Sequence, residues 1–293
     1  MKERRVLPEE VVEVWDYRFN LFRLLLIFSF VLSVITIQAQ EIPVRERFEP
    51  GEELQYELYF KLGILMPRAG LATLSIQDTD FENRPAYHYR LLFQTSGIIE
   101  KIYKMRDTID CHFSPEMLLL QSEKRVNEND YYLIDNIRFS YDKEQIQARS
   151  HRYTLTRTKI DTVLVADEPY MFDMLGATLY LRSLDWTQMK SGDSFPFQVA
   201  IGRDVVNISF RYTGQQIVER SDELKYRTRH FYIDIYDEAF TQSKAAAEIW
   251  VADDENHIPI KIRAKLKIGA AEVHYKTSKG LRYPFSSRFE IKP

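Results

Sequence analysis

The sequence predicts an all-β, mostly antiparallel fold: a single curved sheet, roll or barrel built from many short strands. Apolar and polar residues alternate along most of the chain, as they do in half-buried strands. Aromatic residues, which favour strands, make up 13% of the 293 residues. The apparent strands are short and regularly spaced, which is typical of sandwiches, rolls and barrels.

The alternation begins at residues 54–60, where every second residue is apolar and its neighbours are mostly polar. Further apparent strands lie at 69–77, 87–95, 106–113, 117–126, 131–141, 144–152, 154–165, 195–201, 204–213, 215–220, 226–236, 246–252, 257–268 and 270–276. The ends of these runs, where turns need glycine, hold Gly192, Gly202, Gly214 and Gly269. No linker rich in Gly, Ser or Pro divides the body of the chain. We therefore expect one domain at 44–293, after an N-terminal extension and signal peptide at 1–40.

Two segments break the alternation and predict helices. Apolar residues at helical spacing predict a short helix near 97–104. A second helix is predicted over 169–184, with Asp167 as its cap and Pro169 in its first turn. Apolar residues nearly encircle this helix, and a helix that is apolar all round is buried. We expect it to fill the concave side of the sheet.

The alternative for the second helix is that one of its faces lines an apolar ligand cavity. The lining residues would then be Met171, Leu175 and Leu179. Leu175 and Leu179 lie one turn apart, so they would share a face of the helix.

The N-terminus resembles a secretory signal. An apolar run at 24–37 follows Arg18 and Arg23 and ends shortly before Ala39. The run is shorter than the roughly 20 residues that cross a bilayer, so we expect cleavage after Ala39 and no integral span in the mature chain. The alternative is an uncleaved N-terminal anchor. No cysteine stands at the expected cleavage site directly after the run, which excludes a lipoprotein anchored there, and we expect a periplasmic or outer-envelope location.

Composition excludes several classes of function. Lys and Arg number 40 and Asp and Glu 43, so no net positive field recruits nucleic acid. A lone cysteine, Cys111, excludes an intrachain disulfide and a multi-cysteine metal site. The sequence lacks the motifs of nucleotide-binding loops, zinc proteases and serine hydrolases. We predict no catalytic residue, cofactor or metal ligand.

Two groups of residues could form a catalytic pair or a metal site, but each has a simpler interpretation. Cys111 and His112 could pair as nucleophile and base, yet adjacent strand residues point to opposite faces of a sheet. The acidic stretch at 253–256 could hold Ca²⁺, but it lacks the spaced ligands of a calcium loop. It lies between two strong strands, so a polar hairpin turn is expected.

Basic residues at every second position of 258–268 must share one face of a strand. They are Lys261, Arg263, Lys265 and Lys267. This stripe could bind anions such as lipid head groups or acidic glycans. We expect a solvated outer face whose charges pair with acids on neighbouring strands.

Several short phrases together resemble one known family. They are 48–56, 68–72, 102–107, 173–182 with 192–193, and 248–254 with 258–260 and 268–269. In this order and spacing they are similar to the DUF3108 family, a domain of unknown function found in exported bacterial proteins. The resemblance spans about residues 46–275 and implies export and a mostly β fold. It implies no activity and supplies no catalytic positions.

Two classes of function remain. We favour a non-enzymatic periplasmic binding or envelope-maintenance module that holds a lipid, a glycan or a partner in a concave sheet, by analogy with other curved sheets. The alternative is a hydrolase that acts on envelope polysaccharide through carboxylates dispersed in the sequence. A cavity with paired acids of perturbed pKa would favour the enzyme.

Overall fold

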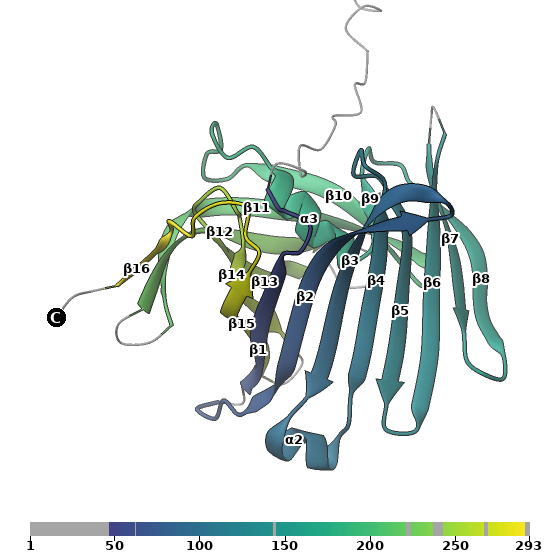
Figure 1. The fold of residues 1–293 in the computed structure, drawn as a ribbon, viewed down its shortest axis with the longest axis horizontal. Helices are drawn as coiled ribbons and strands as arrows, with labels where there is room; N and C mark the ends of the chain where they lie inside the picture. The colour runs from purple at the N-terminus through teal and green to yellow at the C-terminus, as the bar shows by residue number, and fades with distance from the viewer. Residues whose placement is uncertain are drawn as a thin grey trace, which may run out of the picture. The chain divides into compact units, whose positions relative to one another are not determined.

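One large sheet of 16 strands forms the body of the protein in the computed structural model (Figure 1). The structure describes residues 47–61, 63–142, 145–220, 224–236, 243–266 and 269–290. All described residues belong to one compact unit, Ile42–Pro293. The apolar run at 24–37 and the predicted cleavage site at Ala39 lie outside the described residues.

The first half of the chain forms a meander in which each strand pairs with the next. Its strands are β1 (Glu53–Lys61), β2 (Arg68–Phe81), β3 (Arg84–Thr95), β4 (Arg106–Phe113), β5 (Leu119–Glu128), β6 (Tyr131–Tyr141), β7 (Ile146–Tyr153) and β8 (Thr158–Val165). The second half contains β9 (Met171–Phe172), β10 (Ser194–Ile201), β11 (Asp204–Glu219), β12 (Leu224–Tyr236), β13 (Ser243–Ala252), β14 (Pro259–Lys265), β15 (Ala270–Lys279) and β16 (Arg288–Glu290). The two described helices are α2 (Gly97–Ile102) and α3 (Gly176–Ser183).

The two halves join through β1 and β15, which pair antiparallel. The strand order is then β8 to β1, followed by β15 back to β9, with β16 added beside β12. The only parallel pair among the described strands joins β9 to β10. The prediction of a mostly antiparallel, all-β fold is confirmed, and the sheet curls without closing, so β8 and β9 are its edges.

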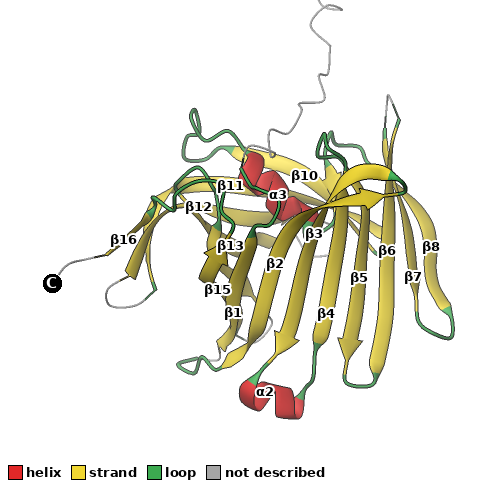
Figure 2. Cartoon of the chain, in the orientation of Figure 1, coloured by secondary structure: helices red, strands yellow, loops and turns green. Residues whose placement is uncertain are grey.

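Helix α3 lies on the inner face of this curled sheet, between the first and second halves of the strand order (Figures 1 and 2). The Tyr89 hydroxyl on β3 is 2.9 Å from the Thr178 hydroxyl on the helix. On the other side of the helix, the Tyr180 ring packs against Phe197 of β10 and Phe210 of β11. The helix therefore contributes to one core shared by both halves of the sheet.

The buried helix predicted near 169–184 is present, but its first half is extended. Met171 and Phe172 form β9 and pair with the outer edge of β10, so neither Asp167 nor Pro169 starts a helix. The helix begins at Gly176, whose N–H donates to the Asp173 carboxylate at 2.7 Å. The short helix predicted near 97–104 is confirmed as α2.

Gly214 was expected at a turn, but it lies inside β11. The pairing register with β12 shifts between Tyr212 and Gly214, which marks a β-bulge. Gly214 has a φ of +132°, a backbone conformation that glycine adopts without a steric penalty. No helix in the described part of the chain is long and apolar enough to cross a membrane.

Candidate functional site

The residues proposed to line an apolar cavity lie in the core. Met171, Leu175 and Leu179 are 1%, 4% and 1% exposed and belong to the shared core cluster. This packing agrees with a helix that fills the concave side of the sheet. Any ligand site formed by the described residues therefore lies elsewhere in the fold.

The basic stripe is partly balanced by one buried acid on the neighbouring strand. Lys261 Nζ lies 3.2 Å from Glu272, and Arg263 Nε lies 3.7 Å from the same carboxylate. Lys265 is exposed at the end of β14, and Lys267 lies outside the described residues. The described stripe thus resembles a paired outer face more closely than an open anion site.

The acidic stretch at 253–256 connects β13 to β14, and its first two carboxylates have protein partners. Asp253 accepts hydrogen bonds from Arg229 at 2.8 Å and from Gln215 at 2.6 Å. Asp254 accepts from the backbone N–H groups of Asn256 and Ser287. Among the described residues, no group of three His, Cys, Asp or Glu side chains could hold a metal ion.

Asp173 holds the N-terminal end of α3 against β4 and β5. Its carboxylate is buried and accepts hydrogen bonds from Gly176 N–H, from the Ser122 hydroxyl at 2.7 Å and from the Cys111 thiol at 3.3 Å. Burial raises the pKa of Cys111 well above its ordinary value, and the nearby charge of Asp173 raises it further. Cys111 is therefore a structural thiol, and His112 points to the opposite face of β4, as predicted.

The C-terminal end of α3 is held by a buried group that we call the clamp: Glu52, Arg182, Asn256 and His257. The Arg182 guanidinium is fully buried and donates to both carboxylate oxygens of Glu52, at 2.6 and 3.0 Å. It also donates to the backbone carbonyl of Asn256. His257 Nδ1–H donates to the Arg182 carbonyl at 2.7 Å, and its ring stacks on Trp186 at 3.5 Å. The clamp thereby pairs the buried charge of Arg182 with that of Glu52. An isolated buried ion would be costly.

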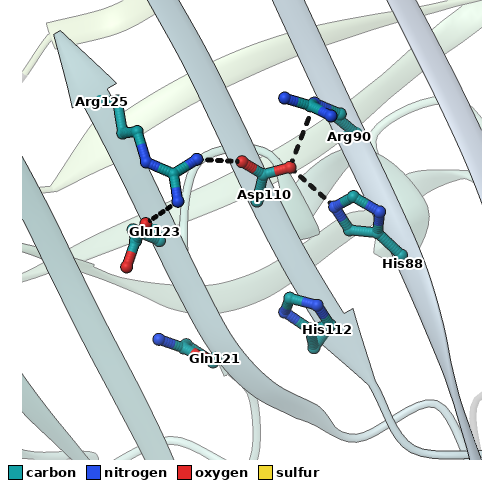
Figure 3. Close-up of a pocket in the computed structure, with 7 residues that line it drawn as sticks. All are labelled: His88, Arg90, Asp110, His112, Gln121, Glu123 and Arg125. Atoms are coloured by element: carbon teal, nitrogen blue, oxygen red, sulfur yellow. Dashed lines mark hydrogen bonds and ion pairs between the residues drawn. The ribbon is translucent and has the colours of Figure 1, made fainter. Parts of the chain in front are cut away.

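A pocket of about 360 Å³ opens on the other, outer face of the sheet, across β3, β4 and β5 (Figure 3). Its lining residues are His88, Arg90, Asp110, His112, Gln121, Glu123 and Arg125. They occupy this face because side chains alternate along each strand, and the intervening Tyr89, Cys111 and Ser122 point into the core. Every residue that lines the pocket is polar or charged.

Strand register arranges most of these side chains in two rows. His88, His112 and Gln121 are cross-strand partners, and so are Arg90, Asp110 and Glu123. Such partners lie close enough to interact directly. The pocket is thus fixed by backbone pairing in the middle of the sheet.

Asp110 is the centre of the charge network shown in Figure 3. Its carboxylate lies 2.6 Å from His88 Nε2, 3.2 Å from Arg90 Nε and 2.9 Å from Arg125 Nη1. Burial alone would raise the pKa of Asp110, but the His88 hydrogen bond and the two arginine charges lower it overall. Asp110 is consequently an ionised hydrogen-bond acceptor, and it is unsuited to act as a general acid.

Arg125 joins the two carboxylates of the pocket. One of its terminal nitrogens contacts Asp110 and the other contacts Glu123. Glu123 also accepts a hydrogen bond from Asn136 at 2.8 Å. The side chains are therefore held in place before any ligand arrives.

His112 has an unsatisfied polar atom. Its ring lies between His88, at 5.0 Å and nearly parallel, and Phe81, at 4.6 Å. Its Nδ1 is buried and has no hydrogen-bond partner among the described residues. Burial lowers the pKa of His112, with a further contribution from His88, so the neutral ring is favoured. Leaving a buried nitrogen without a hydrogen bond costs about 1–3 kcal/mol.

Sequence comparison places the chain in a family. Residues 55–276 match the profile of a family described as a protein of unknown function (DUF3108). The chain belongs to the DUF3108 family. The comparison with curated proteins finds no match.

A structural comparison relates this DUF3108 protein to a second domain of unknown function. The crystal structure of a β-barrel-like protein of the DUF1849 domain from Brucella abortus has a TM-score of 0.54 and 9% sequence identity. The match covers 79% of this chain and 98% of the other. At this identity the likeness concerns the fold alone.

The pocket was missed by sequence reasoning because each histidine and carboxylate was considered separately. The alternation at 88–90, 110–112 and 121–125 already placed polar residues on one face of three consecutive strands. What was missing was the register that brings Asp110 between Arg90 and Glu123. The succession of three strands along the chain was the available signal for it.

Proposed function

We propose that this DUF3108 protein is exported and acts in the cell envelope as a non-enzymatic binding module that holds a glycan in the outer-face pocket. The observation that carries the proposal is the fixed polar lining around Asp110, with acceptors and donors interleaved in two rows. A sugar ring offers hydroxyl groups that both donate and accept, so it can match such a lining. An acyl chain would remove water from these charged groups and offer no hydrogen bond in its place, which is costly.

His112 also lines the pocket, and its neutral ring carries one nitrogen donor and one nitrogen acceptor for hydroxyl groups. The site thus differs from the concave-face site expected from sequence, where the described side chains pack into the core. Export remains part of the proposal, and it is motivated by the apolar run at 24–37.

A polysaccharide hydrolase is the second candidate, because Asp110 and Glu123 face each other across β4 and β5. Retaining glycosidases place two carboxyl groups about 5 Å apart. However, such an enzyme needs one carboxylic acid to be protonated near neutral pH. The lowered pKa of Asp110 and the arginine shared with Glu123 favour binding over catalysis.

The test is a titration of the protein with defined envelope oligosaccharides, measured by isothermal calorimetry. His112→Phe keeps a ring between His88 and Phe81 but removes both ring nitrogens from the pocket lining. We expect binding to weaken about tenfold, the equivalent of one lost hydrogen bond. His151→Phe, on β7 outside the pocket, is the matched control and should bind like the wild type.

Two results would contradict this proposal. Unchanged affinity in His112→Phe would exclude the pocket as the site. Release of shortened oligosaccharide during incubation, abolished by Asp110→Asn, would establish the hydrolase instead. Cell fractionation tests export separately, and recovery of the protein in the cytoplasm would refute that part.

A further inference from the structure

Exposed apolar side chains gather at one end of the sheet. The connections β14–β15, β1–β2 and β3–β4 lie side by side there, because Lys61 pairs with Ala270 and Gly70 pairs with Thr95. Figure 1 shows the β1–β2 tip and α2 along this end, at the lower edge of the view. We call the following side chains the apolar rim: Ile64, Leu65, Met66, Ile98, Ile102 and Leu266.

The fold does not need these side chains for its core. Ile64 is fully exposed, and Ile98 and Ile102 are each 75% exposed. Helix α2 contains no buried residue, although its sequence is rich in isoleucine. Exposed apolar groups collected in one place indicate a surface that is covered by something else.

Cations surround the apolar rim. Lys61, Lys101, Lys104 and Lys265 lie within or beside its three connections, and none forms an ion pair with a described residue. The nearby acid Glu100 is already bonded to Arg106. Two further acids oppose the lysines: Glu128, which accepts a hydrogen bond from the Tyr103 hydroxyl, and Asp130 in the turn that follows it. The rim therefore combines protruding aliphatic tips with a local excess of positive charge.

The opposite end of the sheet has a different character. Its turns carry Glu82, Glu116 and the acidic stretch at 253–255. Leu118 in the β4–β5 connection is also exposed there, at 42%. Glu82, Asp253 and Glu255 are each paired with an arginine, as Glu100 is at the rim. These charges are therefore largely balanced within the protein, whereas the lysines beside the rim are not.

We propose that the apolar rim inserts into the interfacial layer of a bilayer that contains anionic lipids. Aliphatic side chains on separate hairpin tips can enter this layer individually, whereas a protein partner would need a shaped surface to match them. The flanking lysines can reach the head groups while the tips enter the acyl boundary. This inference rests on different residues from the glycan pocket and holds whether or not the pocket binds a glycan.

The test uses the unit at 42–293, because the described core lies wholly within it and the apolar run at 24–37 would itself bind lipid. Its partitioning onto vesicles of phosphatidylcholine with 30–40% phosphatidylglycerol, roughly the anionic content needed for electrostatic attraction, is measured by sedimentation. We expect Ile98→Ser with Ile102→Ser to reduce partitioning more than about tenfold, because binding scales with the apolar area inserted. Lys101→Gln with Lys104→Gln should reduce it about fivefold per lysine on these vesicles.

The control is Leu118→Ser, an exposed aliphatic position at the other end of the sheet, which should partition like the wild type. Thermal unfolding of each variant should match the wild type, since none of the changed side chains is buried. A tryptophan placed by Leu65→Trp should shift its emission to the blue on binding vesicles, and one placed by Leu118→Trp should not. Equal partitioning of wild type and Ile98→Ser with Ile102→Ser, or self-association that these changes abolish, would overturn the proposal.

Discussion

Acid should destabilise this protein through His257, the histidine of the clamp. Its side chain is buried, and burial, together with the positive charges of Arg47, Arg182 and Arg229, lowers its pKa to about 3. In the unfolded chain its pKa returns to about 6.5. Between these values only the unfolded chain binds the proton, so stability is complete above pH 6.5 and is lost as the pH falls. The free energy of unfolding should fall by about 2 kcal/mol between pH 7 and pH 5 from this group alone.

The assay is urea unfolding at pH 7, 6 and 5, followed by tryptophan fluorescence, to which Trp186, the ring on which His257 stacks, contributes. His257→Phe keeps a ring against Trp186 but cannot be protonated. The pKa values of other histidines are also lowered, and these groups titrate equally in both proteins. The difference in stability between the wild type and this variant should therefore shrink by about 2 kcal/mol at pH 5. A difference that stays constant within about 0.5 kcal/mol would refute the buried, neutral state of His257.

Three further predictions concern the core thiol, the helix and the N-terminus. Leu175→Ala with Leu179→Ala should remove most of the stability, since each buried truncation costs about 2–5 kcal/mol against a total of ~5–15 kcal/mol. A melting temperature lowered by only about a degree or two in delipidated protein would reject core filling and favour a gated cavity. Cys111→Ser should leave glycan binding intact, and the wild-type thiol should react with Ellman's reagent only after unfolding; loss of function at unchanged stability would contradict this. Intact mass of the envelope fraction should correspond to a chain that starts after Ala39, whereas a mass that includes residues 1–39 would show an anchor.

The fold was largely predictable because alternation is a local property that burial enforces directly. Leu74 and Ile76 face the core while Ser75 and Gln77 do not, and a similar period-two pattern is found in other strands, such as β6. The burial of α3 was predictable for the same kind of reason, since a helix apolar on all sides has no face to present to water. These conclusions need no knowledge of which strands pair.

The start of that helix was not predictable, because a tertiary interaction overrides the local capping signal. Gln198 of β10 accepts a hydrogen bond from the Asp167 N–H, and its own N–H donates to the Tyr170 carbonyl. The chain is thereby drawn along the outer edge of β10 and forms β9 before the helix can begin. An open strand edge competes for any neighbouring backbone, and that competition is not visible in the residues of 169–184 themselves.

The pocket likewise depends on long-range strand pairing. The residues that carry the resemblance to the family are different from the residues that line the pocket. The phrases that carry the DUF3108 resemblance include Glu52, Asp173 and Arg182, which hold the two ends of α3. None of the residues that line the pocket belongs to these phrases. A related chain could keep the clamp and the curled sheet while outer-face positions such as His112 change, because those positions support no core packing.

The phrase at 102–107 is the exception to this division. Ile102 and Tyr103 are exposed and contribute nothing to the core, and Lys104 follows them in the connection that carries α2. Packing therefore does not account for these side chains, whereas it does account for Glu52 and Arg182. Insertion of the apolar rim into an anionic bilayer would supply a reason for aliphatic, aromatic and basic residues in succession at this position.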